Sequence, residues 1–203
     1  MLFDHPFKNR IFQLKDYVRL LNDAFSTMPI LRQTARSGDF SKAFSERIML
    51  AVTQVNGCRY CEYGHAKMAL EAGVPEVEIK QLLEGEFDQL PAEEIKGLLF
   101  AQHYAESSGL PDKLACEALV DTYGLKTANG ILAYTRMIMI GNALGNTFDA
   151  LLYRLRFNPV PGSRFLDEIG ILIGSFFIIP VIGLFQIFRH GIFPASRMEG
   201  LAR

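Results

Sequence analysis

Apolar side chains recur at helical spacing along most of the first 156 residues of the chain. In the segment 12–26, one predicted helix face carries Phe12, Leu14, Val18, Leu21 and Phe25. No run of residues shows the strict alternation of apolar and polar side chains that is typical of a β-strand. The pattern therefore predicts an all-α protein of antiparallel helices, with helices over residues 12–26, 41–55, 58–72, 75–84, 91–107, 111–123 and 126–156.

Proline and glycine residues predict where several of these helices begin and end. Pro29 follows the first helix and predicts its end, because the residue before a proline disfavours the helical conformation. Pro91 is expected to open the fifth helix, since the first turn of a helix tolerates proline. Gly124 predicts the end of the sixth helix. The long apolar helix after it is expected to break near Gly141 or Gly145.

The composition of the chain changes at residues 158–162, which read Asn-Pro-Val-Pro-Gly. We take this segment as the boundary between a helical domain, residues 1–157, and an apolar extension, residues 158–203. Residues 169–188 contain no charged side chain, and about 20 apolar residues in a helix can span the roughly 30 Å core of a bilayer. The segment therefore predicts either a contact with a membrane or two short buried helices, split at residues 180–183 and covered by partner subunits.

Charge and composition exclude several classes of protein. The chain has 203 residues, with 21 Lys+Arg against 22 Asp+Glu and a formal net charge of -1. This balance argues against a nucleic-acid partner, because contacts with phosphates need a basic excess. Hydrophobic residues make up 49% of the chain, which excludes a disordered protein. Charges interrupt the apolar runs at the N-terminus, unlike a signal peptide, so we expect a cytoplasmic protein, membrane-associated if residues 169–188 contact a bilayer.

The strongest chemical signal in the sequence is a Cys-x-x-Cys pair followed by a histidine. Cys61 and His65 are four residues apart, and Cys58 and His65 are seven apart, so all three share one face of the predicted helix. Cys58 is expected in the first turn, where free N–H groups and the helix dipole favour a thiolate. A reducing compartment disfavours a structural disulfide, so the pair is expected to be catalytic or metal-binding.

Glu46 lies on the helix that precedes this motif. If the two helices pack antiparallel across a turn at Asn56-Gly57, the carboxylate of Glu46 approaches the imidazole of His65. A carboxylate in that position orients the imidazole and raises its basicity. Together these residues predict a pair of thiols, a base and an acid that orients the base.

The cysteine pair has two other interpretations. The thiols could simply pack in a helical core. A zinc ion would take the two cysteines and His65 as ligands and need a fourth, from Cys116 or His103, but the second closely spaced ligand pair of most zinc sites is missing. Cys116 stands among apolar residues and is expected in the core. His103 is expected on a polar helix face.

Residues 46–74, ERIMLAVTQVNGCRYCEYGHAKMALEAGV, resemble the alkylhydroperoxidase D-like group of the carboxymuconolactone decarboxylase superfamily. The shared pattern is a Glu, eleven residues, Cys-x-x-Cys, three residues and a His. The resemblance is strong over residues 46–74 and general over residues 10–156. It implies an alkylhydroperoxidase D-like helical domain whose subunits associate, often as trimers or hexamers. It also implies thiol-dependent reduction of hydroperoxides or disulfides by a dithiol reductant protein, without a metal or another cofactor.

Carried over residue by residue, the resemblance implies that Glu46, Cys58, Cys61 and His65 form a proton relay. Tyr60 stands between the cysteines, where members that reduce peroxides directly often have a His. The decarboxylase branch of the superfamily lacks the cysteine pair. The pair therefore argues against lactone decarboxylation.

We therefore expect a thiol-dependent peroxidase or disulfide oxidoreductase. Cys61 would attack the peroxide and become a sulfenic acid, and Cys58 would resolve it to a disulfide, or the two roles could be reversed. An external dithiol partner would then restore both thiols. The alternative, from a different class, is a redox-sensitive interaction module that is docked on a membrane through residues 169–188 and turns over no substrate.

Overall fold

The computed structural model describes residues 6–38 and 40–190, with side chains as far as Gln186. Within these residues the chain forms eight helices and no strand, which confirms the all-α class. Predictions for the two ends of the chain, and for side chains after Gln186, lie outside the described residues. The helices are α1 (Leu14–Ser37), α2 (Lys42–Asn56), α3 (Arg59–Glu71), α4 (Glu76–Glu84), α5 (Ile95–Glu106), α6 (Lys113–Leu155), α7 (Phe165–Leu172) and α8 (Ser175–His190).

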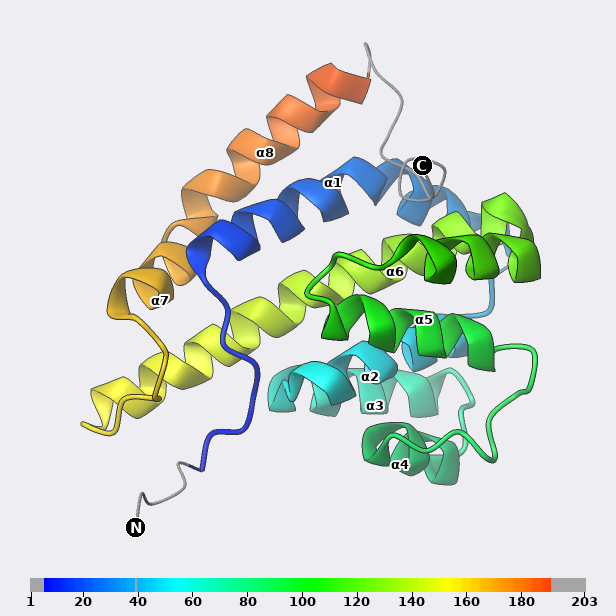
Figure 1. Ribbon diagram of the computed structural model, residues 1–203, viewed down its shortest axis with the longest axis horizontal. Coiled ribbons are helices and arrows are strands. Elements are labelled where there is room, and N and C mark those ends of the chain that lie inside the picture. The colour runs from blue at the N-terminus through cyan, green and yellow to red at the C-terminus, as the bar shows by residue number, and fades with distance from the viewer. Residues whose placement is uncertain (1–5, 39, 191–203) are drawn as a thin grey trace.

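The helices are stacked in layers on the two sides of α6 (Figure 1). α6 crosses the middle of the molecule, α1 packs along one side of it, and α8 lies on the outer side of α1. On the other side of α6 lie α2 and α5, which contact each other as well as α6. α3 and α4 pack on α2. The arrangement places α3 and α4 at one edge of the molecule and α8 at the opposite edge.

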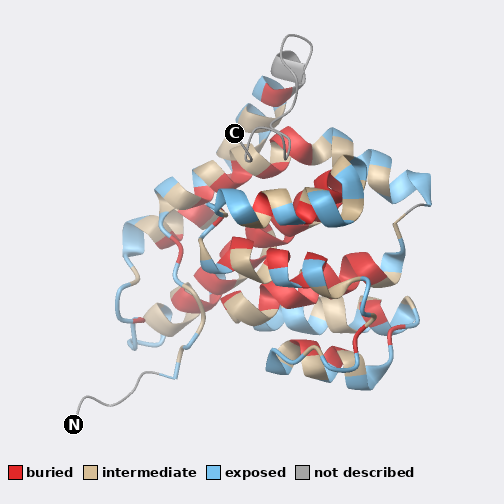
Figure 2. Cartoon of the chain, turned by 45° about the vertical axis from the view of Figure 1, so that its right-hand side comes forward, coloured by how far each residue is buried: buried red, intermediate tan, exposed pale blue. Residues whose placement is uncertain are grey.

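α2 is almost fully enclosed by the other helices. Its apolar side chains Ile48, Leu50 and Val52 are inaccessible to solvent, and Figure 2 shows buried residues gathered on the inner helices. Each large apolar side chain buried in this way contributes roughly 1.5–3 kcal/mol to folding. Ser41 caps the helix, since its hydroxyl accepts the N–H of Phe44 at 2.9 Å. Contacts on all sides fix the positions of the polar side chains that α2 carries.

α1 does not end before Pro29, as the sequence predicted, but continues to Ser37. Pro29 lies on the exposed side of the helix, and its missing N–H removes one hydrogen bond of the helix. The turns after the proline still pack on α6, where Thr34 fills the space beside Gly130. Tertiary packing therefore overrides the local signal of the proline.

The buried face of α1 also differs from the predicted one. Val18 is 37% exposed, and the side chains in the core are Tyr17, Leu20, Leu21 and Ala24. The helix is covered on two sides, by α6 and by α8. Its buried surface is consequently wider than the single apolar stripe that the spacing predicted.

α5 begins at Ile95 instead of Pro91. The residues before it form a turn, in which the N–H of Glu94 donates to the carbonyl of Pro91 at 2.9 Å. The carboxylate of Glu94 faces Arg47 of α2. The later start of α5 thus goes together with a contact between Glu94 and a neighbouring helix. The spacing of prolines does not reveal such a contact.

α6 is interrupted at one of the three glycines that were candidates for a break. Gly124 departs from the helical conformation, with a φ of 72°, as predicted. The helix runs without a break through Gly141 and Gly145, so the expectation of a break there is wrong. These two glycines instead face the cysteine pair of α3.

The apolar extension forms two helices, but they separate at Ile173-Gly174 and not at residues 180–183. Pro180 lies inside α8. At the break, the carbonyl of Ile169 accepts the N–H groups of both Ile173 and Gly174, at 2.9 and 3.4 Å. A side chain at position 174 would overlap the backbone of the preceding turn. The bend therefore depends on glycine, and the proline is accommodated within a helix.

The extension packs on the same core as the rest of the chain. Ile171 is fully buried. Arg154 of α6 forms two hydrogen bonds to the carboxylate of Glu168 in α7, at 2.7 and 2.9 Å. Among residues 6–38 and 40–190, no single helix is long and apolar enough to cross a membrane. By length and composition alone, α7 and α8 as far as Gln186 qualify as a pair, bent by 55°.

Candidate active site

The turn between α2 and α3 places Cys58 at the N-terminus of α3. Gly57 takes the left-handed conformation, and its N–H donates to the carbonyl of Thr53 at 2.7 Å, which ends α2. Cys58 is the N-cap of α3, one position before the first turn in which it was expected. Its Sγ accepts the N–H of Cys61, with an N···S distance of 3.3 Å. The thiol therefore lies where the helix dipole favours a negative charge.

The two thiols are hydrogen-bonded to each other, so they titrate as a pair. The pKa of Cys58 is lowered by the hydrogen bond from the Cys61 thiol and by the N–H groups of Cys61 and Tyr60. Burial acts in the opposite direction and raises it. The pKa of Cys61 is raised by the bond to Cys58, by burial and by the charge on Cys58. Cys58 is fully buried and Cys61 is partly exposed. The pair thus favours a thiolate inside the protein and presents a thiol at its surface.

Glu46 and His65 form the second pair of the site. Nδ1 of His65 lies 2.8 Å from Oε2 of Glu46, and both side chains are largely buried. The sequence predicted this contact across the α2–α3 turn, and the structure confirms it. An ionised carboxylate can only accept a hydrogen bond, so Nδ1 carries the hydrogen and Nε2 is left for proton exchange. Cys61 and His65 are one helical turn apart on α3, which places the two pairs side by side.

A buried polar network beneath the thiols was not predicted. Asn142 of α6 is fully buried and hydrogen-bonds the Cys61 thiol, which opposes the rise in the pKa of Cys61. The Oδ1 atom of Asn142 accepts from Nδ2 of Asn56 at 2.9 Å, and its Nδ2 donates to the hydroxyl of Thr53 at 3.1 Å. The only signal in the sequence was a polar residue within a long apolar helix. This network fixes the amide that supports Cys61.

Glycines of α6 allow this helix to approach the thiols, and they provide a test. A Cβ atom at Gly145 would lie 2.6 Å from Sγ of Cys58, whereas the nearest neighbours of one at Gly141 would be 3.7 Å away. We expect Gly145→Ala to displace the Cys58 thiol from its N-cap position and raise its pKa, because the thiol moves away from the N–H of Cys61. Gly141→Ala, the matched control, should leave the titration unchanged. The ultraviolet absorbance of the thiolate against pH measures both, and identical curves would contradict the assignment.

A rim of side chains surrounds the start of α3 and consists of Arg59, Tyr60 and Phe148. Arg59 forms an ion pair with Asp149, and its guanidinium lies 4.9 Å from the centre of the Tyr60 ring. The Tyr60 ring packs 5.9 Å from that of Phe148. The Tyr60 hydroxyl hydrogen-bonds Arg59 and Asp149 and so belongs to the rim.

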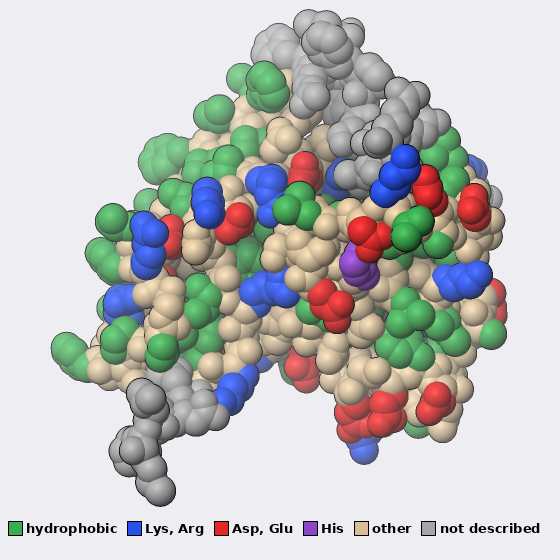
Figure 3. Space-filling view, in the orientation of Figure 1, with side chains coloured by type: hydrophobic (Ala, Val, Ile, Leu, Met, Phe, Trp, Pro, Cys, Tyr) green, Lys and Arg blue, Asp and Glu red, His purple; other side chains and the backbone are tan. Residues whose placement is uncertain are grey.

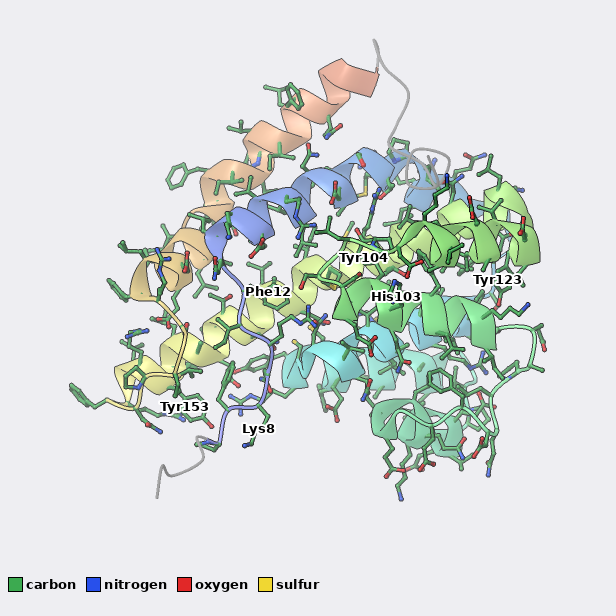
Figure 4. All side chains as sticks on the ribbon, viewed as in Figure 1. Lys8, Phe12, His103, Tyr104, Tyr123 and Tyr153 are labelled. Carbon is green, nitrogen blue, oxygen red and sulfur yellow. The ribbon has the colours of Figure 1, made fainter. Side chains whose placement is uncertain are left out.

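The residues of the zinc interpretation do not assemble. Residues 6–38 and 40–190 contain no group of three or more His, Cys, Asp or Glu side chains that could hold a metal ion. His103 lies on α5 (Figure 4), and its Nε2 atom is 3.0 Å from the carboxylate of Asp112. Cys116 is fully buried in the hydrophobic core, as predicted. Within the described residues, neither candidate for the fourth ligand joins the cysteine pair.

The fold and the site define an all-helical protein with a thiol pair at a helix N-terminus and a carboxylate–imidazole pair one turn away. The model of the carboxymuconolactone decarboxylase family matches residues 23–87, which contain all four predicted site residues. This match is consistent with the superfamily that the motif indicated. Searches of the curated proteins and of the solved structures found no match to the chain.

Proposed function

We propose that this protein is a thiol-dependent oxidoreductase of the alkylhydroperoxidase D type. It would reduce hydroperoxides or disulfides with electrons from a dithiol partner protein. The observation that carries the proposal is the pair of Cys58 and Cys61 at the N-terminus of α3, in which a buried thiol of lowered pKa lies beside a partly exposed one. Two cysteines that alternate between dithiol and disulfide carry both electrons themselves. The adjoining Glu46–His65 pair supplies a base.

Cys61 is the attacking residue in this proposal, because Cys58 is fully buried. The proton of Cys61 passes to His65, and the thiolate attacks one oxygen of the peroxide. The O–O bond breaks, the leaving oxygen takes the proton back from His65, and an alcohol departs. Cys61 is then a sulfenic acid. Glu46 orients the imidazole and stabilises its protonated form.

Cys58 completes the reaction on the protein. Its thiolate attacks the sulfur of Cys61, the disulfide bond forms, and the sulfenic oxygen takes a proton and leaves as water. A dithiol partner then exchanges with the disulfide, returns both cysteines to thiols and becomes a disulfide itself. The association into trimers or hexamers that the resemblance implies belongs to the same proposal.

Intact-mass analysis of the reduced protein, before and after one equivalent of hydroperoxide, tests the proposal. We expect the loss of two hydrogens, which peptide mapping assigns to a Cys58–Cys61 bridge. Cys116 should stay unmodified because it is buried in the core, and Cys116→Ser should give the same result as the unmodified chain. Thiols that stay reduced in the folded protein would overturn peroxide reduction.

A further inference from the structure

We propose that the outer face of α7 and α8 docks on the surface of a lipid bilayer. The polar and apolar positions are inverted along residues 171–186: Ser175 and Gln186, the two polar side chains, are buried, and every exposed residue is apolar. A helix that faces water shows the opposite arrangement. Apart from Pro180, the exposed residues, which we call the apolar face, are Ile173, Phe176, Phe177, Val181, Leu184 and Phe185.

The apolar face is extensive. Phe176 is 80% exposed and Phe177 is 71% exposed, and the other members of the face are all more than half exposed. In Figure 3, apolar side chains gather along the edge of the molecule formed by α7 and α8. A contiguous exposed patch of large apolar side chains marks an interaction site, whereas single exposed ones are ordinary.

Contacts with α1 fix the direction in which this face points. The hydroxyl of Tyr17 lies 2.8 Å from Oγ of Ser175. Nε2 of Gln186 donates to Oδ1 of Asn22 at 2.7 Å. These bonds hold the two polar side chains of α8 against α1. Ser175 is the first residue of α8, and Gln186 is the last one whose side chain is described. Because the opposite side of α8 is bonded to α1, the apolar face points away from the rest of the protein.

The chemistry of the face favours lipid over a second protein chain. A protein interface carries roughly one hydrogen bond per 100–200 Å², and the side chains of the apolar face contain no donor or acceptor. A bilayer requires none. The sequence after Gln186 is also basic, with Arg189, Arg197 and Arg203 against Glu199. Basic residues next to an apolar segment favour a membrane with anionic headgroups.

The neighbouring groups indicate a helix pair that lies in the plane of the bilayer surface. α1, directly beneath α8, carries Asp16, Arg19 and Asp23, whose charges would be costly in hydrocarbon. Pro180 has no N–H to donate to the carbonyl of Phe176, and water at the level of the headgroups can satisfy that carbonyl. Only the apolar face would enter the acyl region, as in other interfacial helices.

Flotation of the purified full chain with lipid vesicles tests this proposal independently of the thiol chemistry. The vesicles are phosphatidylcholine mixed with phosphatidylglycerol, and phosphatidylcholine alone. We expect the chain to float with both and more strongly with the anionic mixture. F176Q/F177Q should weaken partitioning roughly tenfold to a hundredfold, because two phenylalanines lose their apolar contact. The matched control L110Q/L114Q removes two leucines, one just before α6 and one in its first turn, that are 66% and 76% exposed, and it should float normally.

Circular dichroism checks that each variant keeps its helices. If F176Q/F177Q loses its helices, L184Q/F185Q provides a second test on the next turns of α8. Three results would overturn the proposal. The full chain could fail to float with either kind of vesicle. F176Q/F177Q and the control L110Q/L114Q could lose binding equally. A dimer in sedimentation velocity that F176Q/F177Q dissociates, without any vesicle binding, would show that a second copy covers the face.

Discussion

Cys61→Ser is expected to lower peroxide consumption roughly a thousandfold or more, because it removes the accessible nucleophile. Cys58→Ser is expected to stop turnover as well, but only after a single attack, since Cys61 becomes a sulfenic acid that no thiol resolves. The two variants should thus fail at different steps. Peroxide consumption supported by dithiothreitol measures turnover, and dimedone labelling followed by mass spectrometry measures the sulfenic acid.

The control for this pair is Cys116→Ser, which should keep full turnover because Cys116 is a buried core residue. Sulfenic acid in Cys61→Ser but not in Cys58→Ser would reverse the roles of the two cysteines. Full turnover in either variant would contradict the mechanism. A folded unmodified chain that forms the disulfide but never sustains consumption would favour the alternative, a redox-sensitive interaction module.

Arg47→Met is expected to lower the free energy of unfolding by about 3–5 kcal/mol at neutral pH. The guanidinium of Arg47 is buried between two carboxylates, with Nη2 2.7 Å from Glu78 of α4 and Nη1 3.0 Å from Glu94 before α5. Methionine fills a similar length without the charge, so two largely buried carboxylates would face each other without a counter-ion. Urea unfolding followed by circular dichroism measures the loss. Lys80→Met, at an exposed pair with Glu84, should change it by less than about 1 kcal/mol.

The loss in Arg47→Met should grow with pH. Burial raises the pKa of Glu94 above 4.5 even beside Arg47, whose charge lowers it. Without Arg47 the pKa rises further. A carboxyl whose pKa is raised by folding contributes stability below its unfolded pKa and loses it as the pH rises through the folded pKa. The difference between Arg47→Met and the unmodified chain should therefore widen from about pH 4 to neutral pH. A difference independent of pH would show that packing, not charge, causes the loss.

The part of the site that depends on neighbours along the chain could be predicted from the sequence. The contact between Glu46 and His65 follows from two helices joined by one tight turn at Gly57. The contacts of Asn142 and Gly145 with the thiols could not be predicted, because they come from a distant helix whose position depends on tertiary packing. The spacing of residues indicates which side chains share a helix face, but not which other helix covers that face.

The helix boundaries show the same limit. Glycine at position 124 ends a helical segment as predicted, because only glycine takes that conformation without strain. Pro29 and Pro180 both lie inside helices that neighbouring helices support, so the local cost of proline does not decide the outcome. The bend near position 174 depends on the close approach of two backbone segments. Such an approach leaves no pattern that the periodicity of apolar residues could reveal.

The burial of Cys58 also bears on how the oxidised site would be reduced. An incoming thiolate can reach Cys61 but not Cys58, which exposes no surface. Cys58 would then be the leaving group of the exchange, and a thiol leaves faster when its pKa is low. The hydrogen bond from the Cys61 thiol lowers the pKa of Cys58 most in the reduced protein, and the N–H groups at the N-terminus of α3 lower it further. In the proposed cycle, these N–H groups would serve the return half. Burial of Cys58 would direct the reductant to Cys61, and the N–H groups would speed the release of the Cys58 thiolate.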